Sequence, residues 1–132
     1  NPLALAVAVG TGFVARAFAG DADHLAEMIK RGIRHRGFAL IDILQPCVTF
    51  NRVNTWDWYR QRVYKLEAGY NPGDKAAAFN KAQEWGDRIP IGVIYEQTRP
   101  TFEEQLPALS SGPLVKQPTE PAGVERLVNE FM

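Results

Sequence analysis

The hydrophobic pattern near the start of the chain predicts a helix followed by a strand. Residues 2–10 are apolar for about two helical turns, with proline in the first turn and glycine at the end, which is typical of a buried helix. Residues 12–18 are mostly apolar and predict a strand that is interrupted by Arg16. Since 2–10 reads like the inside of a domain, we expect a core helix whose natural predecessor has been removed.

The next segment has the pattern of a helix that leads into a second strand. Asp21 is suited to cap this helix, on which four apolar residues fall on one face: Leu25, Met28, Ile29 and Ile33. Residues 38–44 then form an apolar run in which only Asp42 is charged, as expected for a strand covered on both faces. Together with strand 12–18, this unit predicts parallel strands joined by a right-handed crossover.

Two further helices are predicted in the middle of the chain. Asn54 or Thr55 can cap an aromatic-rich helix that continues to Tyr64. Asp74 can cap another helix, which is rich in alanine and reaches Trp85.

The last third of the chain predicts one strand and then a tail. Residues 89–95 read as a strand, and Pro90 near its start favours a sheet edge. A short helical turn is expected at 100–104. From Pro107 onward the chain is rich in Pro, Ser and Gly, which predicts an extended tail with a last short helix at 124–131.

Composition and charge narrow the classes of function. The 132 residues are 45% hydrophobic and 23% charged, as in an ordinary soluble domain. Fifteen basic and 15 acidic residues give a net charge of zero, which disfavours wholesale binding to nucleic acid or an anionic membrane. Segment 2–10 has no basic flank and is too short to span a bilayer, so we expect neither a signal peptide nor a membrane anchor. A single cysteine suits a reducing compartment, and we expect a cytoplasmic protein.

Few residues form a recognisable catalytic or cofactor-binding pattern. Segment 10–12 lacks the third glycine of a dinucleotide-binding turn, and segment 69–75 lacks P-loop spacing. His24 and His35 lie among Lys and Arg residues, which hinder metal binding and indicate a solvated basic face or a docking surface for an acidic partner. We therefore assign no catalytic residue and no residue that binds an organic cofactor.

Cys47 is the residue on which the functional interpretation depends. It follows the predicted strand 38–44, so it lies at the carboxyl end of that strand, where open α/β sheets bind ligands. A lone cysteine cannot form an internal disulfide, and it cannot hold a metal cluster without ligands from elsewhere. Either this thiol is a small buried hydrophobe, or the chain is a piece of a larger site.

Several separated blocks of the sequence resemble one known family. The blocks are Pro46-Cys47-Val48-Thr49-Phe50-Asn51, Asn54-Thr55-Trp56-Asp57-Trp58-Tyr59, Arg62-Val63-Tyr64-Lys65-Leu66 and Ile89-Pro90-Ile91-Gly92-Val93-Ile94-Tyr95, with shorter matches at 1–2, 13–16 and 37–42. In this order they resemble the carboxyl-terminal half of the β subunit of 2-oxoacid:ferredoxin oxidoreductases. The resemblance covers roughly the first hundred residues.

The resemblance implies a fold and a reaction. The expected fold is α/β, a partial parallel sheet with flanking helices that forms the C-terminal part of a thiamine-diphosphate-binding fold, plus an extended C-terminal tail. Enzymes of this family use thiamine diphosphate and Mg²⁺ to decarboxylate a 2-oxoacid, and they transfer the acyl group to coenzyme A. Electrons pass through a 4Fe-4S cluster to ferredoxin, and the β subunit works with an α subunit. The cysteine of the Pro-Cys-Val-Thr segment is a cluster ligand in the family, which implies that Cys47 is a metal ligand.

The chain also departs from the family by omission. The other cluster cysteines and the Gly-Asp-Gly segment that binds Mg²⁺ and diphosphate lie upstream in the family and are absent here, so we expect the fragment to be inactive alone. We expect three parts: 1–52 as the βαβ part of the thiamine-diphosphate domain, 53–106 as the family's C-terminal extension, and 107–132 as a Pro-rich tail.

Two alternatives stay open: a non-catalytic α/β interaction module, and part of a thiamine-diphosphate decarboxylase without a cluster. The identity of the 2-oxoacid, pyruvate or 2-oxoglutarate, is open as well.

Overall fold

A computed structural model describes residues 1–118 and 121–131 of the chain. The chain divides into two compact units, Asn1–Arg99 and Pro100–Met132. The division into 1–52, 53–106 and 107–132 stays a prediction.

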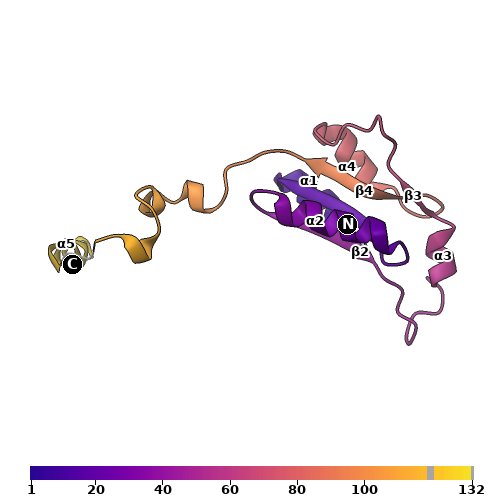
Figure 1. The fold of residues 1–132 in the computed structure, drawn as a ribbon, viewed down its shortest axis with the longest axis horizontal. Helices are drawn as coiled ribbons and strands as arrows, with labels where there is room; N and C mark the ends of the chain where they lie inside the picture. Colours follow the sequence, from indigo (N-terminus) through magenta and orange to yellow (C-terminus); the bar gives the residue numbers. More distant parts are fainter. Residues whose placement is uncertain (119–120, 132) are drawn as a thin grey trace. The chain divides into compact units, whose positions relative to one another are not determined.

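The first unit contains a four-stranded sheet in the order β2-β1-β4-β3 (Figure 1). Its strands are β1 (Phe13–Phe18), β2 (Ala39–Leu44), β3 (Val63–Lys65) and β4 (Ile89–Glu96). β1 and β2 are parallel, as are β3 and β4, whereas β1 and β4 are antiparallel with a register shift after Val14. The prediction of an α/β fold with flanking helices is confirmed. The sheet is mixed rather than wholly parallel, because an apolar run looks the same whichever direction its neighbour takes.

The expected edge position of the Pro90 strand is wrong, since β4 lies between β1 and β3. The backbone shows why an inner strand tolerates this proline. The Ile89 N–H donates to Arg62 O on the β3 side at 2.8 Å, so the next nitrogen, that of Pro90, faces β1. The pairing of β4 with β1 ends at Gly92, so no ladder hydrogen bond is lost at Pro90.

The helices begin at the residues that the sequence indicates. α1 (Pro2–Val9) ends at Gly10, whose φ of 81° is the left-handed conformation that glycine favours. α2 (Ala22–Arg34) and α4 (Lys75–Gln83) are capped by the side chains of Asp21 and Asp74, each accepting a backbone N–H. Thr55 caps α3 (Trp56–Arg60) in the same way.

Two predicted helices end earlier than expected. The aromatic-rich helix stops at Arg60, because Val63–Lys65 pairs with β4 as strand β3. The alanine-rich helix stops at Gln83, so Trp85 lies beyond its end. In the first case, pairing with a neighbouring strand overrides local helix preference.

Helices cover both faces of the sheet. α1 and α4 pack together against one face, where they enclose Val14 and Ile94. α2 covers the other face through Met28, which packs on Phe13 and Ala15. A third cluster joins the ends of β1 and β2 to the aromatic residues of α3; its buried members are Phe18, Leu44, Ile89 and Ile91.

The predicted covering of strand 38–44 on both faces is wrong, and the apolar face of α2 is only partly buried. On α2, Ile29 and Ile33 are 38% and 78% exposed, although Met28 on the same helix is buried. Strand β2 is half-buried rather than covered on both faces, because it is the edge strand of the sheet. The apolar patterns of 22–34 and 38–44 correctly predict a helix and a strand. Part of the apolar surface of α2 and β2 is nevertheless left uncovered by residues 1–99.

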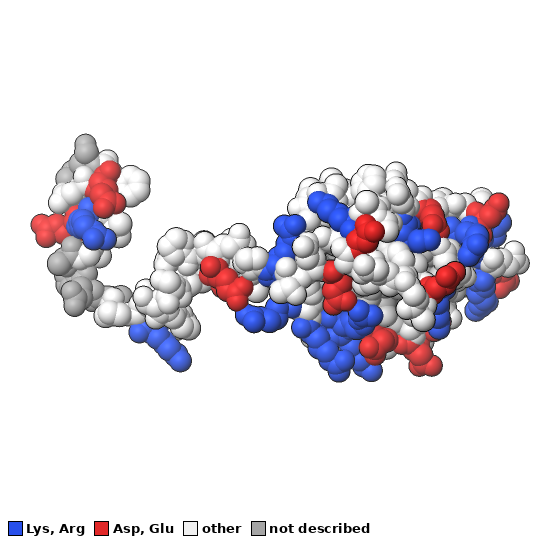
Figure 2. Space-filling model, turned by 90° about the horizontal axis from the view of Figure 1, so that it is seen from above, with Lys and Arg blue, Asp and Glu red and all other residues white. Residues whose placement is uncertain are grey.

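The second unit consists of short elements. Three 3₁₀ turns, η1 (Glu103–Gln105), η2 (Pro107–Leu109) and η3 (Leu114–Lys116), precede helix α5 (Pro121–Glu130). The helical turn near 100–104 and the last helix are therefore confirmed to within a few residues. No helix within 1–118 or 121–131 is long and apolar enough to span a membrane. Basic and acidic side chains lie next to one another over much of the face that Figure 2 presents.

Candidate functional site

Cys47 lies in the loop that joins β2 to α3. β1 and β2 are parallel, and Phe18 pairs with Leu44 at their carboxyl ends. The loop that follows β2 therefore begins beside the carboxyl end of β1. The chain makes a turn directly after Cys47, and the Asn51 N–H donates to Cys47 O at 3.1 Å. The cysteine is exposed, so the structure does not support the alternative of a small buried hydrophobe.

Backbone amides surround the thiol of Cys47. The N–H groups of Phe50 and Thr49, and to a lesser degree that of Asn51, donate toward the sulfur and lower the pKa of Cys47. Such amides favour the thiolate, which is the form of cysteine that binds metal ions. The loop therefore presents an exposed sulfur whose thiolate form is favoured by the neighbouring amides.

Asn51 organises the second half of this loop, a role that the sequence analysis did not assign. Its side-chain Oδ1 accepts the N–H groups of Val53 and Asn54, each at 3.0 Å. Its Nδ2 donates to the side-chain oxygen of Asn54 at 3.1 Å. An asparagine a few residues before a helix cap is a recognisable signal for such an Asx turn.

The same loop exposes large apolar side chains. Val48, Phe50 and Val53 are 73%, 91% and 75% exposed, and they flank the cysteine in sequence. Within the described ranges no three His, Cys, Asp or Glu residues lie close enough to hold a metal ion. Cys47 is the only cysteine in the sequence.

An ion pair links β1 and β2 below the loop. Arg16 Nε lies 2.9 Å from Asp42 Oδ2, and the arginine side chain is only 2% exposed. Trp85 lies beside the guanidinium, with its ring centre 5.4 Å from Arg16 Cζ. Arg16 interrupts the predicted strand 12–18, and Asp42 is the only charged residue of the predicted strand 38–44. The two residues lie opposite each other in the pairing of β1 with β2.

The two histidines lie at opposite ends of α2. His24 is in the first turn of α2 beside Asp21, and burial lowers the pKa of its imidazole. His35 ends α2, so it lies with the basic segment 30–36 near the amino end of β2, whereas Cys47 follows the carboxyl end. His35 packs its ring against Phe13, with ring centres 5.6 Å apart.

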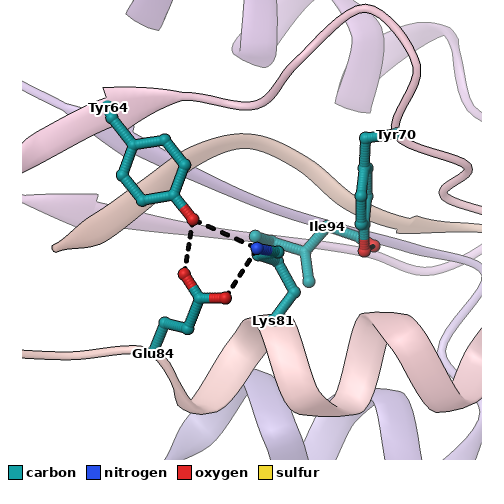
Figure 3. Close-up of polar contacts among 5 residues, drawn as sticks. All are labelled: Tyr64, Tyr70, Lys81, Glu84 and Ile94. Carbon is teal, nitrogen blue, oxygen red and sulfur yellow. Dashed lines mark hydrogen bonds and ion pairs between the residues drawn. The ribbon is translucent and has the colours of Figure 1, made fainter.

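A cleft of about 620 Å³ lies between β3 and the end of α4, and the sequence analysis did not anticipate it. Figure 3 shows its polar network: the Tyr64 hydroxyl donates to the Glu84 carboxylate, and Lys81 Nζ lies 2.6 Å from Glu84 Oε1. Lys81 Nζ also donates to the Tyr64 oxygen at 3.2 Å. Nearby, the Tyr70 hydroxyl donates to Ile94 O at 2.7 Å.

Burial and mutual hydrogen bonds determine which of Tyr64, Lys81 and Glu84 are ionised. Burial and the hydrogen bond to Glu84 raise the pKa of Tyr64, and the hydrogen bond to Glu84 raises the pKa of Lys81. Burial opposes ionisation of Glu84, but the hydrogen bonds from Lys81 and Tyr64 outweigh it and lower the Glu84 pKa. At neutral pH the tyrosine is therefore neutral, the lysine cationic and the glutamate anionic, each with a partner. This arrangement links β3 to the end of α4.

Comparison with known proteins identifies the family. Residues 47–111 match the family model described as the C-terminal part of the pyruvate ferredoxin oxidoreductase beta subunit. A 2-oxoacid:ferredoxin oxidoreductase subunit beta from Sulfolobus is 47% identical over 122 residues, which cover 83% of this chain and 40% of the relative. The subunit beta of 2-oxoacid:ferredoxin oxidoreductase 1 from Aeropyrum pernix is 48% identical over 118 residues, covering 80% of this chain and 37% of that protein.

A solved structure agrees with these relatives. It is a 2-oxoglutarate:ferredoxin oxidoreductase from Magnetococcus marinus with 2-oxoglutarate, coenzyme A and succinyl-CoA bound. The TM-score is 0.84 at 32% identity, over 96% of this chain and 44% of that chain. The chain thus spans about 40% of the length of the curated relatives. It belongs to the family of 2-oxoacid:ferredoxin oxidoreductase β subunits, of which it represents a C-terminal portion.

Proposed function

We propose that this chain is part of a β subunit that catalyses the coenzyme A-dependent oxidative decarboxylation of a 2-oxoacid, with Cys47 as one ligand of a 4Fe-4S cluster. The observation that carries the assignment is the exposed Cys47 sulfur, toward which three backbone amides donate. Iron–sulfur clusters require thiolate ligands, and hydrogen bonds to sulfur tune their potentials. The cluster, when bound, accepts electrons one at a time and passes them to ferredoxin.

The part played by this chain's own residues is to present the sulfur. The turn after Cys47 fixes the direction of the amides, and Asn51 holds the next residues in place through its side chain. Below the loop, the ion pair between Arg16 and Asp42 joins the two strands that end there. A rigid support of this kind keeps the donor within the narrow range that a metal site requires.

Thiamine diphosphate and Mg²⁺ belong to the proposed enzyme but do not fit the residues of this chain. The Gly-Asp segment that directly follows β1, at 20–21, is engaged in capping α2, where Asp21 accepts the His24 N–H at 3.1 Å. Asp21 is also paired with Lys65 at 2.8 Å, so its carboxylate is already neutralised. We therefore place the diphosphate site, and any role in a thiamine-diphosphate-binding fold, with segments of the parent subunit that lie outside this chain.

We further propose that the complete enzyme is cytoplasmic, works with an α subunit and uses ferredoxin as electron acceptor. The relatives' names favour such an oxidoreductase over a cluster-free decarboxylase. The acceptor should approach the loop around Cys47 rather than the basic segment 30–36. At about 3.3 Å per residue, the six residues of β2 separate these regions by roughly 20 Å.

The cluster assignment is tested on the complete β subunit purified with its α partner. Iron and acid-labile sulfide are measured for the wild type, for Cys47→Ala and for the control Val48→Ala, which alters an exposed neighbour in the same loop. We expect Cys47→Ala to lose the intact 4Fe-4S cluster and the control to keep it. Full retention of iron and sulfide in Cys47→Ala would show that this cysteine is not a ligand.

Substrate class is tested on the same preparation. A 2-oxoacid should reduce ferredoxin only when coenzyme A is present, and pyruvate and 2-oxoglutarate should be compared directly. The fragment by itself should show no activity with either, because it supplies one thiolate and no diphosphate site.

A further inference from the structure

The described side chains of the second unit, those of 100–118 and 123–131, form no hydrophobic core of their own. Among the residues of 100–118 and 123–131, whose side chains are described, none is buried. Large apolar side chains are instead exposed along the segment, including Phe102 at 73%, Leu114 at 62% and Val115 at 91%. A segment that buries so little apolar surface gains little stability from its own contacts.

Helix α5 concentrates this apolar surface into a stripe. Four exposed apolar residues in and directly after this helix occur at the spacing i, i+3, i+4 and i+7, which places them on one side of a helix: Val124 (62% exposed), Leu127 (51%), Val128 (50%) and, one residue beyond α5, Phe131 (91%). Its polar residues occupy the other side: Glu125, Arg126, Asn129 and Glu130. The pattern is that of a helix that inserts its apolar side into a groove.

The length of α5 adds to this argument. It has 10 residues, and isolated helices shorter than about 12 residues are marginal in water. The ion pair between Arg126 and Glu130 is exposed and spans 3.9 Å, so it adds little. A cover over the apolar stripe would stabilise the helix.

The charge of the segment indicates what kind of surface provides that cover. From Pro100 onward the sequence has five acidic and two basic residues, a net charge of −3, although the whole chain is neutral. Acidic Glu125 and Glu130 lie on either side of the apolar stripe. A complementary surface therefore has an apolar floor and basic margins.

We propose that residues 100–131 are a docking arm that seats the apolar stripe of α5 in an apolar, basic-rimmed groove on the α subunit. This inference rests on the proposed function, which supplies that partner. The relatives are each one named subunit of an enzyme, so an unlike chain is available in the assembly. The second unit is about a quarter of the chain, so a match over 96% of it means that most of the arm has a counterpart in the ligand-bound oxidoreductase.

The test uses the complete β subunit and its α partner. Leu127→Asp places a charge in the middle of the stripe, and Asn129→Asp places the same group on the polar side of the same helix as a matched control. Loss of an apolar anchor at an interface centre weakens binding by about thirtyfold or more, so we expect that loss for Leu127→Asp and less than about threefold for the control. Equal affinity of both variants and the wild type would overturn the proposal.

A photo-crosslinking residue in place of Phe131 identifies the occupant of the groove. Mass spectrometry should find the crosslink on the α subunit, whereas a crosslink to a second β subunit or only to its own chain would contradict the assignment.

Iron analysis separates failure of the docking arm from failure of the proposed function. A wild-type complex that contains the cluster but tolerates Leu127→Asp disproves the arm alone, and a β subunit that has neither iron nor an α partner disproves the proposed function.

Discussion

Removing the Asp42 carboxylate should destabilise the first unit strongly, because it would leave a buried charge without its partner. The Arg16 side chain is 2% exposed, and Asp42 is 27% exposed. The Arg16 Nη1 atom already lacks a hydrogen-bond partner among the described residues, so no second acceptor stands ready to replace the aspartate.

The size of the effect follows from burial. Breaking a buried ion pair by deleting one partner costs about 3–5 kcal/mol, and partial exposure of Asp42 places Asp42→Ala near 3 kcal/mol. The matched control is Asp57→Ala, which breaks the ion pair between Asp57 and Arg60. In this pair the Arg60 side chain is 58% exposed and the Asp57 side chain is 79% exposed. An exposed pair of this kind is worth about 0–1 kcal/mol.

Urea unfolding of the 132-residue chain measures both values. With a urea dependence near 2 kcal/mol per molar, the midpoint should fall by about 1.5 M for Asp42→Ala and by less than about 0.5 M for Asp57→Ala. The double variant Arg16→Met with Asp42→Leu should recover most of the loss, since similar apolar residues replace buried pairs well. Equal, small shifts for Asp42→Ala and Asp57→Ala would refute the reasoning.

Three further outcomes are expected. The amides around Cys47 lower its thiol pKa, so alkylation by iodoacetamide should reach half its maximal rate at a lower pH than for free cysteine, and Asn51→Ala should move that midpoint upward. The lowered pKa of Glu84 contributes stability that is present above the unfolded pKa near 4.3 and is lost as the pH falls through the folded pKa. In Glu84→Gln the urea midpoint should therefore depend less on pH in that range. The difference in unfolding free energy should be less than about 1 kcal/mol, because the Glu84 side chain is 38% exposed. In the complete enzyme at low salt, Arg52→Glu near Cys47 should slow ferredoxin reduction, whereas Arg34→Glu should not; the opposite order would place the acceptor at the basic segment.

The sequence was sufficient where the chemistry is local. Asp21 and Asp74 can be recognised as helix caps from their own residue type and the pattern after them, and both cap in the structure. Of the two candidates Asn54 and Thr55, Thr55 is the cap. The same holds for Gly10, whose left-handed conformation ends α1.

The sequence was insufficient where long-range pairing decides. Val63 and Tyr64 were assigned to a helix because nothing nearby reveals that β4 pairs with them. The antiparallel contact of β1 with β4 has no local signature either, and it also makes Pro90 an inner residue. Helical spacing places Ile33 on the same face as Met28, but burial depends on which surfaces cover the helix, and this chain leaves Ile33 78% exposed.

The candidate site shows the same division. Cys47 was singled out by its position after an apolar run and by the resemblance of its segment to a known family. The cleft around Tyr64 was missed because Lys81 and Glu84 come from the end of another helix, and only the fold brings the three together.

Electron paramagnetic resonance of the reduced, complete β subunit with its α partner tests the central claim most directly. Cys47→Ser should keep a cluster with a changed spectrum, because oxygen would replace one sulfur donor, and Cys47→Ala should abolish the wild-type signal. A Cys47→Ala spectrum identical to that of the wild type would contradict the account.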